Sequence, residues 1–149
     1  MVISWLGQSC FKIQVKGDAG QDVTIVFAPY NPSLGRKLSR NLSADILFFL
    51  FDHPDHNYRD GVSGDPFLIT GPGEYETKGV FVYGVATFHD AKNGEEHGKN
   101  TVYHITAEGL TFVHCGDLGH EFTEAQLGVI EDAHILCVPV GGNDTLNTE

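Results

Sequence analysis

Residues 46–57 read ILFFLFDHPDHN, an apolar run of six residues that passes directly into two histidines and two aspartates. An unbroken apolar run bounded by polar turn residues is typical of a β-strand covered on both faces. In the polar part, His53, Asp55 and His56 carry the imidazole nitrogens and carboxylate oxygens that borderline metal ions prefer. The stretch therefore predicts a buried strand that delivers a metal-binding loop.

Short runs rich in β-branched and aromatic residues, separated by Gly, Asn, Asp and Pro, fill most of the chain. Nine are expected as strands: VISWLG, CFKIQVKG, DVTIVFAP, ADILFFLF, PFLITG, GVFVYGVATF, NTVYHITAEG, LTFVHCG and HILCVPVGG. Nine short strands imply stacked sheets, and the fully apolar ones require helices outside them. TEAQLGVIE at 123–131 predicts a helix with Thr123 as N-cap and Gln126 as its capping-box partner, and a weaker helical turn is expected over 32–42. With no linker or internal repeat, residues 1–149 are expected to form a single domain.

The overall charge is strongly negative. Nine basic residues against twenty acidic ones give a formal net charge of -11, which disfavours nucleic acid and anionic membranes as partners. The N-terminus shows no signal-peptide pattern, and no apolar stretch reaches the roughly 18 residues that span a bilayer. Cys10, Cys115 and Cys137 lie in apolar, strand-like contexts, which suits buried, reduced thiols. A cytoplasmic location is therefore expected.

Two further predicted strands also end in His or Asp. GVATF is followed by His89 and Asp90, and LTFVHC is followed by Gly116, Asp117 and, three residues later, His120. Scaffolds of sheets assemble ligands from distant sequence positions in this way. Taken singly, each has a structural alternative, because a lone His after a strand is more often structural and Asp-Leu-Gly is usually a turn. The other histidines are expected to be structural: His97, His104, His114 and His134.

Four segments, in this order, resemble the metallo-β-lactamase superfamily: HPDH at 53–56, GDPFLITGPGEYETKGVFVYGV at 64–85, FHDAKNGEEHGKNTVYHI at 88–105 and HCGDLGH at 114–120. Within it, they are most similar to bacterial Zn-dependent hydrolases related to ascorbate-phosphate lactonase. The resemblance runs from Met1 to about Gly142. It implies an α+β fold, the αββα sandwich, whose edge carries one or two zinc ions. The ligands it implies are a His-x-His-x-Asp-His motif, a later His, a bridging Asp and a last His.

Residue by residue, the resemblance places the second His of the motif at His53, its Asp at Asp55 and its final His at His56. The later His falls on His89 and the bridging Asp on Asp117, with His120 as a neighbour of the site. His53, Asp55, His56, His89 and Asp117 are thus the implied metal ligands, and Asp55 and His120 the implied catalytic residues. Asp55 can orient an attacking water. The implied substrate is a small molecule with a lactone, phosphoester or amide-like bond.

The chain departs from the family's pattern at several positions. Phe51 stands where the motif has its first His, and Asp52 cannot substitute, because adjacent side chains of an extended segment point to opposite faces. Gln8 stands where the family usually has His, and Ala28 where it usually has Asp. The chain also ends at Glu149, before the family's last His and the C-terminal half of its sandwich. We therefore expect weak or partial metal binding.

Two functions stay open from the sequence. The first is a metal-dependent hydrolase, favoured by the five retained ligands. The second is a degenerate, non-catalytic member that acts as a binding or oligomeric partner, favoured by the replaced ligands. Half a sandwich would expose a sheet edge and an apolar face. A homo-oligomer, a separately encoded partner that supplies the missing half, or a rearranged smaller sandwich would each cover them.

Overall fold

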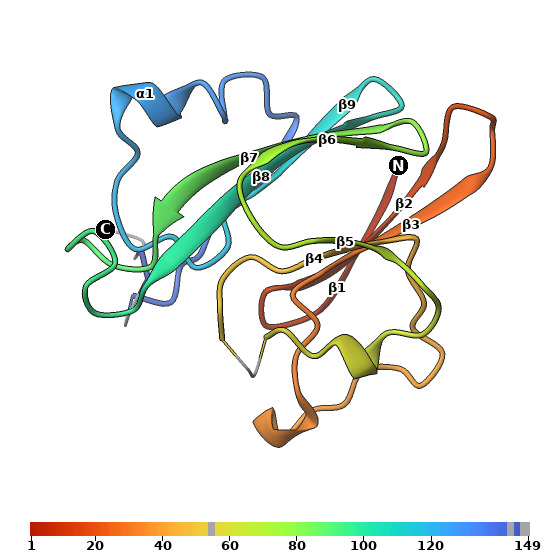
Figure 1. Ribbon diagram of the computed structural model, residues 1–149, viewed down its shortest axis with the longest axis horizontal. Helices are drawn as coiled ribbons and strands as arrows, with labels where there is room; N and C mark the ends of the chain where they lie inside the picture. Colours follow the sequence, from red (N-terminus) through yellow and green to blue (C-terminus); the bar gives the residue numbers. More distant parts are fainter. Residues whose placement is uncertain (54–55, 143–144, 147–149) are drawn as a thin grey trace.

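Two β-sheets packed face to face form the protein, as described by the computed structural model for residues 1–53, 56–142 and 145–146 (Figure 1). The strand order is β1-β2-β3-β4-β5 in the first sheet and β10-β9-β8-β7-β6 in the second. The first sheet comprises β1 (Val2–Gly7), β2 (Cys10–Lys16), β3 (Asp22–Phe27), β4 (Ile46–Phe48) and β5 (Phe67–Ile69). The second comprises β6 (Gly73–Thr77), β7 (Val80–Phe88), β8 (Lys99–Ala107), β9 (Leu110–His114) and β10 (Ile135–Cys137). The expected β-rich, two-sheet fold is confirmed.

Three parallel strand pairs determine where the long connections run. β4 lies parallel to β3, β5 parallel to β4, and β10 parallel to β9, whereas the other neighbours are antiparallel. A parallel pair requires a crossover connection, so the chain returns over the outside of each sheet. These crossovers carry the short helical elements: the 3₁₀ turns Pro32–Leu34 and Arg59–Gly61, and α1 (Glu124–Leu127). In Figure 1 the 3₁₀ turns and α1 lie on opposite sides of the molecule.

The core between the sheets is built from aromatic rings. Phe27 stacks on Phe48 with their ring centroids 4.5 Å apart, and both reach the second sheet, where Phe27 lies 5.7 Å from Phe112 and Phe48 lies 4.9 Å from Tyr103. All four rings are fully buried. Smaller apolar clusters attach the crossovers to the outer faces, around Leu47 on the first sheet and Val113 on the second. The αββα layering implied by the resemblance is therefore present, with few helical residues in its outer layers.

Three expectations about individual elements were incomplete. β6, GEYET, was not expected, because Gly and Glu are poor strand formers, and its pairing with β7 forms the edge of the sheet. The helix expected over 123–131 is confined to Glu124–Leu127, although Gln126 accepts the Thr123 N–H at 3.1 Å as the capping box requires. The turn expected over 32–42 ends at Gly35, whose φ of 80° is left-handed. None of the helices in the described residues has the length and apolar character needed to cross a membrane.

Among the described residues, backbone hydrogen bonds join the two sheets where the segment after β4 meets the start of β8. The Thr101 N–H donates to the Leu50 carbonyl at 2.7 Å, and Phe51 forms an isolated antiparallel bridge with Asn100. The Tyr103 hydroxyl lies 3.2 Å from the carbonyl of Phe49 in the same segment. The segment that leads into His53 is therefore held directly against the start of β8.

Candidate metal centre

The predicted ligands gather in one pocket of about 370 Å³ beside this junction. His53 and His56 follow β4, His89 follows β7, and Asp117 follows β9. The residues that line the pocket are Gln8, Phe51, His53, His56, His89, Asp117, Gly141 and Thr145. Asp55, the fifth predicted ligand, lies outside the described residues.

His89 and Asp117 lie close together in the pocket. His89 Nε2 lies 3.6 Å from Asp117 Oδ2, and the side chains are only 15% and 19% exposed. The Ser9 hydroxyl donates to the other carboxylate oxygen, Oδ1, at 3.1 Å, which leaves Oδ2 facing His89. Two ligand atoms about 2.1 Å from a tetrahedral ion lie roughly 3.4 Å apart. The His89–Asp117 pair therefore has nearly the spacing of two ligands of one ion.

Phe51 separates this pair from the histidines after β4. Its side chain is buried, and its ring centroid lies 5.2 Å from that of His56 and 5.5 Å from that of His89. The rings of His53 and His56 lie 5.7 Å apart. Phe51 thus points into the site, as expected for a residue at a ligand position. In the part of the chain that the structure describes, no three His, Cys, Asp or Glu side chains have the spacing that would hold a metal ion.

The donor set fits one divalent ion of the zinc type. One imidazole and one carboxylate are already spaced as ligands, and two further imidazoles line the same pocket. Completing the coordination requires a further imidazole at this pair, and the Phe51 ring lies against both His56 and His89. The described residues therefore provide a candidate metal centre in which His89 and Asp117 already lie near ligand spacing.

His114 connects two of the loops that form the site. Its Nδ1 accepts the Gly116 N–H at 2.9 Å, and its Nε2 donates to the Ser9 carbonyl at 3.0 Å, so the proton is on Nε2. The ring is buried, and this burial lowers the pKa of His114 to about 4. As expected, His114 is structural: it is a neutral cross-link between the Ser9 loop and the turn that carries Asp117.

Asp90 organises the loop that follows His89. Its buried carboxylate accepts four backbone N–H groups, from Lys92, Gly94, Glu96 and His97, at 2.7 to 3.1 Å. Burial alone would raise the pKa of Asp90, but these four donors hold it well below its usual range. The loop formed in this way brings the His97 ring to 5.4 Å from the His89 ring. Asp90 therefore supports the position of His89 without facing the pocket.

His120 lies behind the pocket. Its Nε2 accepts the Phe88 N–H at 3.1 Å, and its Nδ1 lies 2.7 Å from the Glu121 carbonyl. Both ring nitrogens are thus engaged by backbone groups, one of them on the residue before His89. The structure places His120 as a support of β7, next to the candidate centre and outside its lining.

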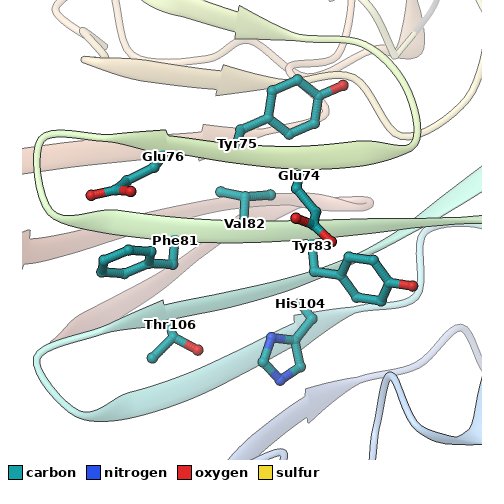
Figure 2. A pocket seen from close by; sticks show the side chains of 8 residues that line it. All are labelled: Glu74, Tyr75, Glu76, Phe81, Val82, Tyr83, His104 and Thr106. Carbon is teal, nitrogen blue, oxygen red and sulfur yellow. The ribbon is translucent and has the colours of Figure 1, made fainter.

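A separate hollow of about 410 Å³ lies on the outer face of β6, β7 and β8 (Figure 2). Figure 2 shows Phe81, Tyr83 and His104 on this face, together with Glu74. Neighbouring strands align Glu74 with Tyr83 and Tyr83 with His104. This hollow is lined by one imidazole, His104, and two carboxylates, Glu74 and Glu76, whereas the described lining of the pocket beside the sheet junction has three imidazoles and one carboxylate. The candidate metal centre is therefore the pocket beside the sheet junction.

Comparison with known proteins identifies the family. The model of the β-lactamase superfamily domain matches residues 2–149. The chain belongs to the metallo-β-lactamase superfamily. A Thermotoga maritima structure assigned to the Zn-dependent hydrolases of this superfamily is 35% identical, with a TM-score of 0.76, and the match covers 97% of this chain and 64% of that one. The chain thus spans less than two thirds of the length of this relative.

Other similar proteins are more distant in sequence. A metal-dependent hydrolase of Thermoplasma volcanium is 25% identical, over 99% of this chain and 74% of its own length. One from Lawsonia intracellularis is 26% identical, over 98% and 74%. The metallo hydrolase structure from Ignicoccus hospitalis, at 19% identity and a TM-score of 0.63, shares the fold. The match covers 97% of this chain and 72% of the Ignicoccus hospitalis chain.

Three residues support the candidate site in ways that were not predicted from the sequence. Ser9 orients Asp117, Asp90 anchors the loop after His89, and Asn100 accepts the Asp117 N–H at 3.0 Å. The sequence held one signal for Asn100: it directly precedes the apolar run TVYHI. An amide at the start of such a strand is often buried, as Asn100 is, and a buried amide requires hydrogen-bond partners. The partners themselves depend on how the strands pair, which the sequence does not reveal.

The burial of His114 predicts a specific loss of stability in mild acid. In the unfolded chain His114 takes up a proton near pH 6.5, but in the folded protein only near pH 4. The stability that neutral, buried His114 contributes is therefore complete above pH 6.5 and is lost as the pH falls toward 4. The shift corresponds to about 3 kcal/mol of unfolding free energy. Denaturant unfolding between pH 4 and 7 should show this slope in the wild type and not in His114→Gln. His134→Gln, at an exposed histidine, is the control, and equal slopes in the wild type and His114→Gln would contradict the assignment.

Proposed function

We propose that this superfamily member is a zinc-dependent hydrolase of a small molecule, which holds one ion through His89, Asp117 and the imidazoles of the 53–56 segment. The observation that carries the proposal is the 3.6 Å separation of His89 Nε2 and Asp117 Oδ2 in a pocket that also contains His53 and His56. The proposal is also supported by two similar proteins that are named metal-dependent hydrolases. Asp55 is proposed as a ligand or as a base, on the resemblance alone.

The residues around the site have separate tasks in this proposal. When bound, the ion would polarise the substrate and lower the pKa of a water molecule. The Ser9 hydroxyl keeps one Asp117 oxygen occupied, so that the other faces His89. The Phe51 ring excludes water from one side of the pocket, which strengthens electrostatic interactions inside it.

The charges around the pocket favour an uncharged substrate. Among the described residues that line it, none is Lys or Arg, and Asp117 adds a negative charge. The chain as a whole carries a formal charge of -11, so a phosphoester would be repelled before it reached the ion. We therefore propose a neutral lactone or amide-like substrate in preference to a phosphoester.

Hydrolysis assays with and without metal test this function. Purified protein reconstituted with zinc should hydrolyse γ-butyrolactone-type substrates faster than p-nitrophenyl phosphate, and excess EDTA should abolish the activity. Asp117→Asn, which keeps the shape of the side chain but removes its charge, should lower kcat/KM by at least roughly tenfold. The proposal would be contradicted if neither EDTA nor Asp117→Asn changed the rates of lactone and phosphoester hydrolysis.

One observation favours a second function, that of a non-catalytic binding module. The Phe51 ring contacts both His56 and His89 and occupies a ligand position of the family's motif. If this ring keeps His53 and His56 from the ion, the His89–Asp117 pair alone would bind zinc weakly. A non-catalytic module would thus bind zinc more weakly than the hydrolase, and a substitution of Phe51 can test this difference.

Phe51→His should raise the zinc affinity, because it adds an imidazole between His56 and His89. The expected gain is at least roughly tenfold. Isothermal titration at neutral pH measures it, and Phe51→Leu, which is apolar and cannot bind zinc, is the matched control. Equal affinities of Phe51→His and Phe51→Leu would show that position 51 does not face the ion.

We also propose a self-association surface and a cytoplasmic location. A hollow of about 400 Å³ lies where the strand edges of β1 and β10 meet, and its lining has no Lys, Arg, Asp or Glu among the described residues. Trp5 and Val140 in it are 64% and 60% exposed. An uncharged apolar surface on so acidic a chain supports the expected homo-oligomer or partner chain, which stays a prediction. Three free cysteines in the described residues support a cytoplasmic location.

A further inference from the structure

One buried residue contacts all three segments that carry the candidate ligands. The backbone of Asn100 forms a bridge with Phe51, two residues before His53. In the β7–β8 ladder Asn100 is paired with Thr87, two residues before His89. Its side chain reaches the turn after β9, where Asp117 lies. Asn100 is 2% exposed, so these contacts lie in the interior.

Both polar atoms of the Asn100 side-chain amide are hydrogen-bonded to these segments. Nδ2 donates to Thr87 Oγ1 at 2.8 Å and to the Cys115 carbonyl at 2.9 Å. Oδ1 accepts the Asp117 N–H at 3.0 Å. Both N–H donors and the oxygen thus have a partner in this one orientation. Rotating it would leave buried groups unpaired, at a cost of about 1 to 3 kcal/mol each.

The turn at Gly116 is shaped around the same amide. Gly116 has a φ of 61°, and a Cβ atom added there would lie 2.3 Å from Asn100 Oδ1. A side chain at position 116 would therefore be strained and would also displace the amide. Because the turn lies so close to Asn100, the backbone at the next residue is fixed, and with it the direction of the Asp117 side chain.

We propose that Asn100 is the positioning residue of the metal centre, which sets Asp117 at ligand spacing from His89 and ties both to the segment that carries His53. The inference rests on the proposed metal-binding function. Asn100 does not line the pocket, so it acts through the backbone of Asp117 and through its strand pairing with Phe51 and Thr87. Its loss should change the arrangement of the ligands more than the stability of the fold.

Cobalt titration of the full chain tests this, because the visible spectrum of bound Co²⁺ reports the number and geometry of its ligands. Asn100→Ala should weaken Co²⁺ binding at least roughly tenfold and alter the spectrum. Asn100→Asp keeps an acceptor for the Asp117 N–H and should recover part of the affinity. Thr111→Val is the matched control: Thr111 is a buried polar residue of β9, bonded to Thr106 on the face shown in Figure 2. It should lower the melting temperature and leave the Co²⁺ affinity and spectrum unchanged.

A measurement without metal separates this inference from the proposed function. In the wild type, the Asp117 amide should exchange its hydrogen at least roughly tenfold more slowly than an unprotected amide, because Asn100 accepts it in the interior. Exchange at the unprotected rate would overturn the inference, whether or not Asn100→Ala folds. Wild-type affinity and spectrum in Asn100→Ala would overturn it as well. If the wild type binds no Co²⁺, the proposed function fails, and the exchange of the Asp117 amide in the wild type and in Asn100→Ala decides the role of Asn100.

Discussion

The candidate metal centre depends on the junction where the segment after β4 shares backbone hydrogen bonds with β8 of the other sheet. The bond from Thr101 to Leu50 and the bridge between Phe51 and Asn100 set the register of one sheet against the other. β4, β7 and β9 each end near this junction, and each is followed by candidate ligands. A shift of one residue at the junction would turn Phe51 and its neighbours to the opposite face. The junction therefore determines which side chains can share a pocket.

Buried polar groups then hold the individual loops in place. His114, Asn100 and Asp90 are each at most 5% exposed, and each bonds to backbone groups of loops that carry site residues. Burying such groups without partners would cost several kcal/mol, so their bonding determines the loop conformations closely. The neutral His114 illustrates the consequence, because the same burial that makes it a good cross-link makes it a weak base. Rigid support of this kind is what a preorganised site requires.

The amino-acid sequence predicts the strands and the ligands better than their support. Apolar runs such as ILFFLF predicted the buried strand and its loop, since periodicity and burial are local properties. β6 was missed because its pairing with β7 outweighs the weak strand preference of GEYET. The helix in TEAQLGVIE was predicted too long, since it ends at Gly128, a poor helix former. Asn100 and Asp90 act through partners that only the strand register and loop path bring close. Phe51 was predicted to face the site, and the structure adds that its ring contacts two of the histidines.

The most direct test of this account is the position of a bound ion. Crystals grown with zinc and measured at the zinc absorption edge locate it by anomalous scattering. The account predicts one strong peak about 2.0 to 2.2 Å from both His89 Nε2 and Asp117 Oδ2, with an imidazole of the 53–56 segment as a third ligand. A peak bound elsewhere on the chain, or no peak at saturating zinc, would contradict the assignment of the pocket beside the sheet junction as a metal centre.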